Sequence, residues 1–128
     1  MEARSVKKYI RASPRKMRPI VNVVRGKSVP EALDVLNFLP QSATATVKLA
    51  IMSAVHNLMD QHQDERFDED KLFVREIRVD EGPMFGRFRP APRGRAMRIR
   101  KRTSHLTVVV GQIDAEAETA SEADAADA

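Results

Sequence analysis

The spacing of apolar residues predicts three helices in the first half of the chain. The first begins at Ser13-Pro14, a capping residue followed by proline at the first helical position, and ends at Gly26. The second begins at a capping box in residues 28–31 and ends at Pro40, and the third covers residues 42–62. The apolar positions at helical spacing are Met17, Ile20, Val21 and Val24, then Ala32, Leu33, Leu36 and Leu39, then Val47, Ala50, Ile51, Ala54, Leu58 and Met59.

Alternation and β-branched content predict strands on either side of these helices. Residues 4–11 predict an exposed strand with Val6 and Ile10 on one side, and residues 72–80 and about 97–110 predict two more. Paired antiparallel, the last two form a hairpin around residues 81–96, a loop with three prolines and three glycines. Compact hairpins turn in about two to five residues, so an unpaired tip of this length is either disordered or built to reach a partner. The fold class is therefore α+β: a small antiparallel sheet with three helices packed on it and a long protruding β-hairpin.

Length and composition narrow the class of protein. A chain of 128 residues suits one domain, and the absence of cysteine excludes disulfides, thiolate metal sites and thiol catalysis. The longest uncharged stretch, residues 35–47, is too short to span a bilayer, and the N-terminus has no apolar core like that of a secretory signal. We therefore expect a cytoplasmic protein with no membrane partner.

The net charge of +4 conceals an uneven distribution. Residues 114–128 hold six acids and no base, and the remaining 22 bases and 12 acids give residues 1–113 a charge of +10. We expect residues 1–113 to form a single nucleic-acid-binding domain and residues 114–128 to form an acidic disordered tail. A basic domain of this size favours a polyanionic partner.

The hairpin loop carries the most distinctive chemistry. Residues 84–102 contain eight bases and no acid, and seven of the eight are arginine, whose planar fork matches phosphate oxygens. Phe85 and Phe88 lie between these charges and are placed to stack on a partner. A second cluster of nine bases lies in residues 4–27. The pattern favours RNA, which irregular elements recognise by shape and backbone; a solvated basic face and a free DNA- or RNA-binding regulator are the alternatives.

The sequence gives little support for a catalytic site or a metal site. His56 and His62 lie on different faces of the third helix, and adjacent Ser104 and His105 point to opposite faces of a strand, so neither pair assembles a nucleophile and a base. The acidic segment 64–70 lacks the ligand periodicity of a calcium loop and predicts a solvated loop. We expect no enzyme activity, metal, cofactor or small-molecule substrate.

Several motifs in order resemble one family. The segments VDEGP at 79–83, GRA at 94–96 and KRTSHLTVVV at 101–110 are similar to those of the bacterial large-subunit ribosomal protein numbered twenty-two. SPRKMR at 13–18 and VRGKSVPEAL at 24–33 match in the same order, and the resemblance covers about residues 4–112.

The resemblance implies a structural constituent of the large ribosomal subunit. Such a protein ties ribosomal RNA domains together during early assembly, contacts neighbouring ribosomal proteins, and lines the nascent-peptide exit tunnel with its hairpin. The hairpin arm would be residues 79–105, with its tip at 84–93. The residues implied to bind ribosomal RNA are Arg11, Arg15, Lys16, Arg18, Arg25, Lys27, Arg87, Arg89, Arg93, Arg95, Arg98, Arg100, Lys101, Arg102, Ser104 and His105. Those implied to form the tunnel tip, beside the nascent peptide, are Met84, Phe85, Gly86, Arg87, Phe88, Arg89 and Pro90.

Three features depart from the family's pattern. Ala91 replaces the arginine that normally follows the tip proline, and Pro92 adds a second proline. Pro19 stands inside the first helix, where it removes a backbone hydrogen bond and predicts a kink or a loosened first turn. The acidic tail lies outside the shared pattern; shielding of the basic domain and a dispensable solubilising role are both open.

Overall fold

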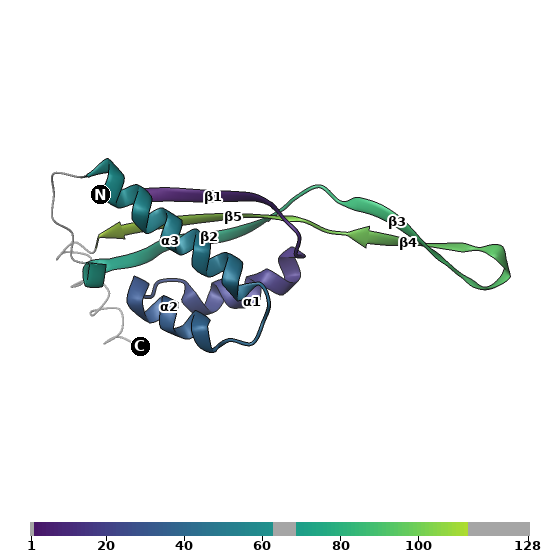
Figure 1. Cartoon of the computed structure of the whole chain (residues 1–128), viewed down its shortest axis with the longest axis horizontal. Coiled ribbons are helices and arrows are strands. Elements are labelled where there is room, and N and C mark those ends of the chain that lie inside the picture. Colours follow the sequence, from purple (N-terminus) through teal and green to yellow (C-terminus); the bar gives the residue numbers. More distant parts are fainter. Residues whose placement is uncertain (1, 63–68, 113–128) are drawn as a thin grey trace, which may run out of the picture.

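The computed structural model describes residues 2–62 and 69–112. A body of helices and sheet carries a two-stranded ribbon that projects along the long axis of the molecule (Figure 1). The elements in chain order are β1 (Glu2–Ile10), α1 (Pro14–Val24), α2 (Val29–Phe38), α3 (Thr44–Gln61), η1 (Glu69–Lys71), β2 (Leu72–Glu81), β3 (Phe85–Pro90), η2 (Pro92–Gly94), β4 (Ala96–Lys101) and β5 (Ser104–Gln112).

The body is built on a three-stranded antiparallel sheet in the order β1-β5-β2. The central strand, β5, is hydrogen-bonded on both sides, and its alternate residues Leu106, Val108 and Val110 are buried. These side chains face the helices, because successive residues of a strand point to opposite faces. Most of the KRTSHLTVVV motif at residues 101–110 therefore lies in β5, the central strand of the sheet.

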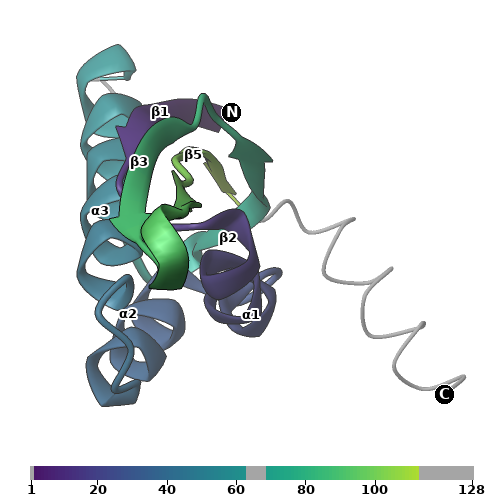
Figure 2. The same cartoon turned by 90° about the vertical axis from the view of Figure 1, so that its right-hand side faces the viewer.

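The three helices lie along one side of this sheet (Figure 2). Helix α3 packs on β1 and β5, α1 packs on β2, and α2 packs mainly against α3. Their buried faces match the apolar stripes of the sequence at Met17, Ile20, Val47, Ile51 and Leu58, which are almost fully enclosed. The α+β prediction is confirmed. Among the described helices, none is long and apolar enough to cross a membrane.

The first strand differs from the prediction in which side chains it buries. Val6 is exposed, whereas Ala3, Ser5 and Ile10 are buried. Regular pairing with β5 is interrupted between Lys7 and Ile10, where Tyr9 has a positive φ of 60°. This irregularity shifts the alternation by one residue, so Val6 and Ile10 do not share a face.

Local features of the helices also differ from expectation. Helix α1 continues from Pro14 to Val24 through Pro19, whose ring lies on the exposed side while Met17 and Ile20 remain buried. Ser28 precedes α2 in the extended conformation of a cap, but its side chain makes no capping hydrogen bond. The expected capping box therefore marks the start of the helix without forming its reciprocal bonds.

The largest corrections concern the loop expected at residues 81–96 and the single strand expected at about 97–110, which is divided into β4 and β5 in two different sheets. Residues 85–90 and 96–101 pair as a regular antiparallel ladder, a separate two-stranded sheet that extends the hairpin away from the body. The turn occupies residues 91–95 and is closed by the Ala91 amide, which donates to the Arg95 carbonyl at 2.7 Å. Residues 84–101 are called the distal hairpin below. Most of the expected tip, residues 84–90, thus forms its shaft.

Two regions discussed in the sequence lie largely or wholly outside the described residues. The acidic loop prediction for residues 64–70 falls mainly on the undescribed segment 63–68, and the tail prediction falls on the undescribed segment 113–128.

Candidate RNA interface

The distal hairpin presents bases and apolar groups on both of its faces. Paired residues share a face, so one face carries Phe85, Arg87, Arg89, Met97, Ile99 and Lys101. The opposite face carries Phe88, Pro90, Ala96, Arg98 and Arg100. Apart from the half-buried Ile99, all residues of β3 and β4 are exposed. Apart from Phe85, over whose ring the Arg11 guanidinium of the body lies, both faces are exposed and available to a partner.

The charges of the distal hairpin are not neutralised within the described part of the chain. Arg102, just beyond it, pairs with Glu81 at 3.0 Å, but no ion pair within residues 2–62 and 69–112 involves a base of residues 84–101. The other ion pairs lie on the body, where Arg75 meets Glu2 and Arg78 meets Glu76 and Asp80. The unpaired bases therefore form a concentrated positive field suited to phosphate.

A basic hollow lies where the distal hairpin meets the beginning of α1. Its volume is about 510 Å³, and Phe85 lies in its wall with the Arg11 guanidinium 5.9 Å from the ring centroid. The bases that line it are Arg11, Lys16, Arg87, Arg100, Lys101 and Arg102. A second hollow of about 370 Å³ shares Ser13 and Arg102 with the first and adds Arg15 and Arg18. The two sequence clusters of bases thus meet at one concave surface.

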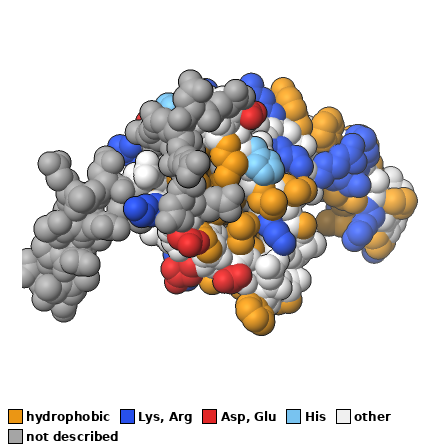
Figure 3. All heavy atoms as spheres, turned by 60° about the vertical axis from the view of Figure 1, so that its left-hand side comes forward, with side chains coloured by type: hydrophobic (Ala, Val, Ile, Leu, Met, Phe, Trp, Pro, Cys, Tyr) orange, Lys and Arg blue, Asp and Glu red, His pale blue; other side chains and the backbone are white. Residues whose placement is uncertain are grey.

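A space-filling view shows the same separation of charge. In Figure 3, Lys and Arg side chains gather on the side away from the grey atoms, interleaved with hydrophobic ones, and Asp and Glu side chains lie mostly nearer the grey atoms. The mixture of cationic and apolar groups matches the chemistry of RNA, which offers both phosphates and stacking bases.

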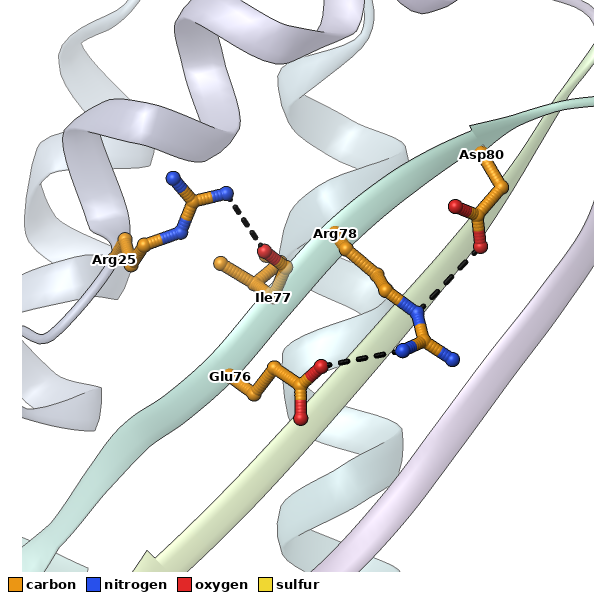
Figure 4. Close-up of polar contacts among 5 residues, drawn as sticks. All are labelled: Arg25, Glu76, Ile77, Arg78 and Asp80. Carbon is orange, nitrogen blue, oxygen red and sulfur yellow. Dashed lines mark hydrogen bonds and ion pairs between the residues drawn. The ribbon is translucent and has the colours of Figure 1, made fainter.

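Four of the expected site residues lie apart from this surface or have structural partners. Arg25 donates to the Asn22 side chain and, at 2.8 Å, to the Ile77 carbonyl, so it fastens the end of α1 to β2 (Figure 4). Lys27 is half-buried next to it, and its carbonyl accepts from the Val74 amide. These two bases are at the opposite end of α1 from Ser13 and the basic hollow.

The remaining two are Ser104 and His105. Ser104 is fully buried and its hydroxyl donates to the Ala12 carbonyl, so its side chain has a structural partner and does not reach the surface of the body. His105 is half-buried, and its Nδ1 accepts from the Tyr9 amide at 3.1 Å. The two point to opposite faces of β5, as the sequence predicts.

Other exposed bases were not singled out from the sequence. Arg4, Lys7 and Lys8 lie on β1, at the edge of the sheet, and are exposed. The density of bases in residues 4–11 indicates that some of them are exposed. The sequence does not reveal the irregular pairing near Tyr9, so it does not show which of these bases face outward. Among the described residues, no group of His, Asp and Glu side chains is arranged to hold a metal ion.

Comparison with known proteins shows to which family this chain belongs. Residues 5–111 match the model of the family described as ribosomal protein L22p/L17e. The chain belongs to the L22p/L17e family of ribosomal proteins. It is similar to the large ribosomal subunit protein uL22 of Salinibacter ruber, with 58% identity over 86% of this chain and 90% of that protein. It is also similar to those of Desulfitobacterium hafniense, 50% identical over 85% and 93% of the two chains, and Syntrophotalea carbinolica, 49% identical over 88% and 99%.

Membership in the L22p/L17e family confirms the resemblance noted in the sequence. The chain is a ribosomal protein with a structural role and is not an enzyme. The matched region begins within β1, includes the three helices and the distal hairpin, and ends one residue before the end of β5. The family's shared pattern therefore specifies the body and the distal hairpin together.

Proposed function

We propose that this protein, as a constituent of the large ribosomal subunit, binds ribosomal RNA through the basic hollow and inserts its distal hairpin into the RNA. The observation that carries the proposal is the composition of the two hairpin faces: each mixes arginine or lysine with apolar side chains, and neither is covered by the body. A two-stranded hairpin without packing is marginally stable in water. Enclosure by RNA supplies phosphates for its bases and stacking surfaces for Phe85 and Phe88.

The residues proposed to contact RNA form two groups. At the hollow they are Arg11, Arg15, Lys16, Arg18, Arg100, Lys101 and Arg102, and along the distal hairpin they are Arg87, Arg89, Arg93, Arg95 and Arg98. Because these groups extend from the body to the turn, a single molecule can bridge RNA segments that lie apart. This bridging supports a role in early assembly, when separate RNA domains must be held together.

We assign the tunnel-lining role to the turn and the adjoining strand ends. Residues 91–95 form the end of the distal hairpin, and Arg93 and Arg95 are exposed there. A nascent peptide passing this end would meet cationic and polar groups. Residues 84–90 form the shaft, where the exposed Met84, Phe85 and Phe88 suit an RNA wall.

Contacts with neighbouring ribosomal proteins belong to the helical side of the body. Phe38, at the end of α2, is 89% exposed, and Leu49 on α3 is 61% exposed. Large apolar side chains with this exposure are suited to protein contacts.

A salt titration with a matched pair of double variants tests the RNA contact. Replacing Arg98 and Arg100 with alanine removes two unpaired bases from one face of the distal hairpin. The logarithm of affinity for a large-subunit ribosomal RNA fragment should then depend less steeply on salt, by about 0.7 to 0.9 for each phosphate that is no longer neutralised. Filter binding across a potassium chloride series measures this slope.

The control removes the same charge from the body. Arg75 and Arg78 are exposed but paired with carboxylates, so replacing both with alanine should leave the slope nearly unchanged. An equal decrease of slope in the two double variants would show that net charge, and not the distal hairpin, drives binding.

A further inference from the structure

The distal hairpin is attached to the body by two short links. The ladder between β2 and β5 ends at Glu81 and Ser104, and the ladder between β3 and β4 begins at Phe85 and Lys101. Residues 82–84 and 102–103 connect the two sheets. A connection of this kind would act as a hinge unless contacts across it fixed its geometry. These contacts decide whether the hairpin has a defined direction before it meets RNA.

Thr103 makes the central contacts of this joint. Thr103 as a whole is 1% exposed, and its hydroxyl donates to the Pro83 carbonyl at 2.6 Å. Its own carbonyl accepts from the Gly82 amide at 2.9 Å. The two links are therefore tied together by one backbone bond and one side-chain bond, at a level where regular strand pairing has stopped. Pro83 has no backbone N–H, so its carbonyl is the only backbone group through which it can form a hydrogen bond.

Gly82 permits the close approach on which these bonds depend. A Cβ atom at this position would lie 2.5 Å from the Thr103 hydroxyl oxygen and 3.2 Å from ring atoms of His105. Neither neighbour can retreat cheaply: the Thr103 side chain is short and enclosed, and the His105 ring is held by the Tyr9 amide and packs edge-on against the Tyr9 ring with centroids 5.1 Å apart. Any side chain here would separate the two links.

The body side of the joint is itself fixed. Ser104, next to Thr103, is fully buried and bonded to the Ala12 carbonyl, which joins the start of β5 to the segment between β1 and α1. From the same segment, Arg11 reaches over the Phe85 ring on the distal hairpin. The body side of the joint is therefore held in place, and the two hydrogen bonds of Thr103 fix the distal hairpin relative to it.

We propose that Gly82 and Thr103 are positioning residues that hold the distal hairpin at a fixed angle to the body in the free protein. The consequence for RNA rests on the function proposed above: a hairpin with a set direction enters RNA without first losing orientational freedom, which favours fast association. The geometry itself is a property of the free chain and is tested without RNA.

The test measures the angle between hairpin and body in the full-length free protein. Because the chain contains no cysteine, spin labels can be placed on cysteines introduced at Ser53 on α3 and Ala96 near the turn, both exposed. Pulsed electron paramagnetic resonance then gives the distribution of distances between them. A second pair, at Ser53 and Glu76, reports on the body alone.

Three variants distinguish the joint from a general structural effect. Thr103→Val keeps the shape and removes the hydroxyl, Gly82→Ala adds the methyl group that collides with it, and Thr103→Ser retains the hydroxyl. We expect the first two to broaden the hairpin-to-body distribution at least twofold and the serine variant to keep it narrow. The body pair should stay unchanged in all three, with helical circular dichroism like that of the original protein.

Each other outcome overturns the proposal. An unchanged hairpin-to-body distribution in Thr103→Val would show that the hydroxyl does not set the angle. Broadening of the body pair, or loss of helical signal, would show that Thr103 belongs to the general core and not to a joint. Broadening in Thr103→Ser as severe as in Thr103→Val would assign the effect to the methyl group.

A binding experiment separates this proposal from the proposed function. Thr103→Val should associate about three- to tenfold more slowly with the ribosomal RNA fragment, with the same salt slope as the original protein, because every base that meets a phosphate is still present. If the hairpin broadens and association is unaffected, the joint is real but the hairpin's direction does not limit binding. That result would contradict the consequence drawn above for RNA.

Discussion

At a few positions the fold depends on a single residue that can adopt an unusual backbone conformation. Gly26 ends α1 with φ of +78°, and its amide donates to the Val74 carbonyl, which fastens the helix end to β2. A Cβ atom there would meet nothing within 4 Å, so steric crowding is not the issue. The left-handed conformation itself disfavours other residues. Glycine is therefore favoured at position 26 because it adopts a positive φ without strain, and not because a larger residue would collide with a neighbour.

Gly26→Ala should therefore destabilise the protein by about 1 kcal/mol, the usual cost of a left-handed conformation in a residue with a Cβ atom. Urea unfolding followed by circular dichroism measures the change. Gly86→Ala is the matched control, because a Cβ atom there also meets open space but φ is not positive. Its effect should stay within about 0.5 kcal/mol. Equal decreases in stability in both variants would contradict the conformational explanation.

The buried side chains of the helices could be predicted at this scale, whereas irregular backbone could not. Met17, Ile51 and Leu58 follow a period that any amphipathic helix imposes, so their burial was predictable. The exposure of Val6 was not, because it depends on the positive φ of Tyr9 and on a bond to His105, which lies 96 residues away. No local pattern contains that information.

At the scale of elements, prediction succeeded wherever one face of an element is buried. Helix α3 and strands β2 and β5 carry clear apolar faces, and the ranges of α3 and β2 match expectation closely. Strands β3 and β4 lack such a face: Phe88 lies beside Arg98 on one side, and Arg87 lies beside Ile99 on the other. Alternation signals a strand only when one side is buried, so the sequence pattern predicts a loop over residues 81–96, although β3 within it is paired with β4.

The same observation predicts that the body folds without the distal hairpin. No side chain of residues 84–101 is buried, and the hydrophobic core draws entirely on the body. Replacing residues 85–101 with a short glycine- and asparagine-containing turn should leave cooperative thermal unfolding in place, with the midpoint changed by only a few degrees. Affinity for the ribosomal RNA fragment should fall sharply. A non-cooperative melt would show that the hairpin contributes to the core.

At the scale of the whole molecule, the two basic clusters of the sequence become one surface. The start of α1 and the base of the distal hairpin are about seventy to ninety residues apart in the chain, yet Lys16 and Arg100 line the same hollow. The sequence indicated both clusters and their polyanionic partner. It could not indicate that Arg25 and Lys27 lie at the far end of α1, because that depends on how the helix packs against β2.

The uneven charge of the chain leads to a last prediction. The six acids of residues 114–128 lower the net charge from +10 to +4, and this segment contains no base to offset them. Ending the chain at Ile113 should strengthen binding to unrelated RNA about three- to tenfold at 50 mM salt, because the cationic surface then attracts phosphates without competition. The difference should vanish near 0.5 M salt, where charges are screened over a few ångströms.

A full-length control separates charge from length. Replacing the six acids with asparagine and glutamine keeps all 128 residues and removes the negative charge, so it should behave like the shortened chain. Competition between cognate and unrelated RNA, measured at both salt concentrations, then shows whether the acids improve discrimination. If the neutralised chain bound unrelated RNA no better than the original, the acidic residues would have no shielding role, and the basic surface alone would determine how this protein selects RNA.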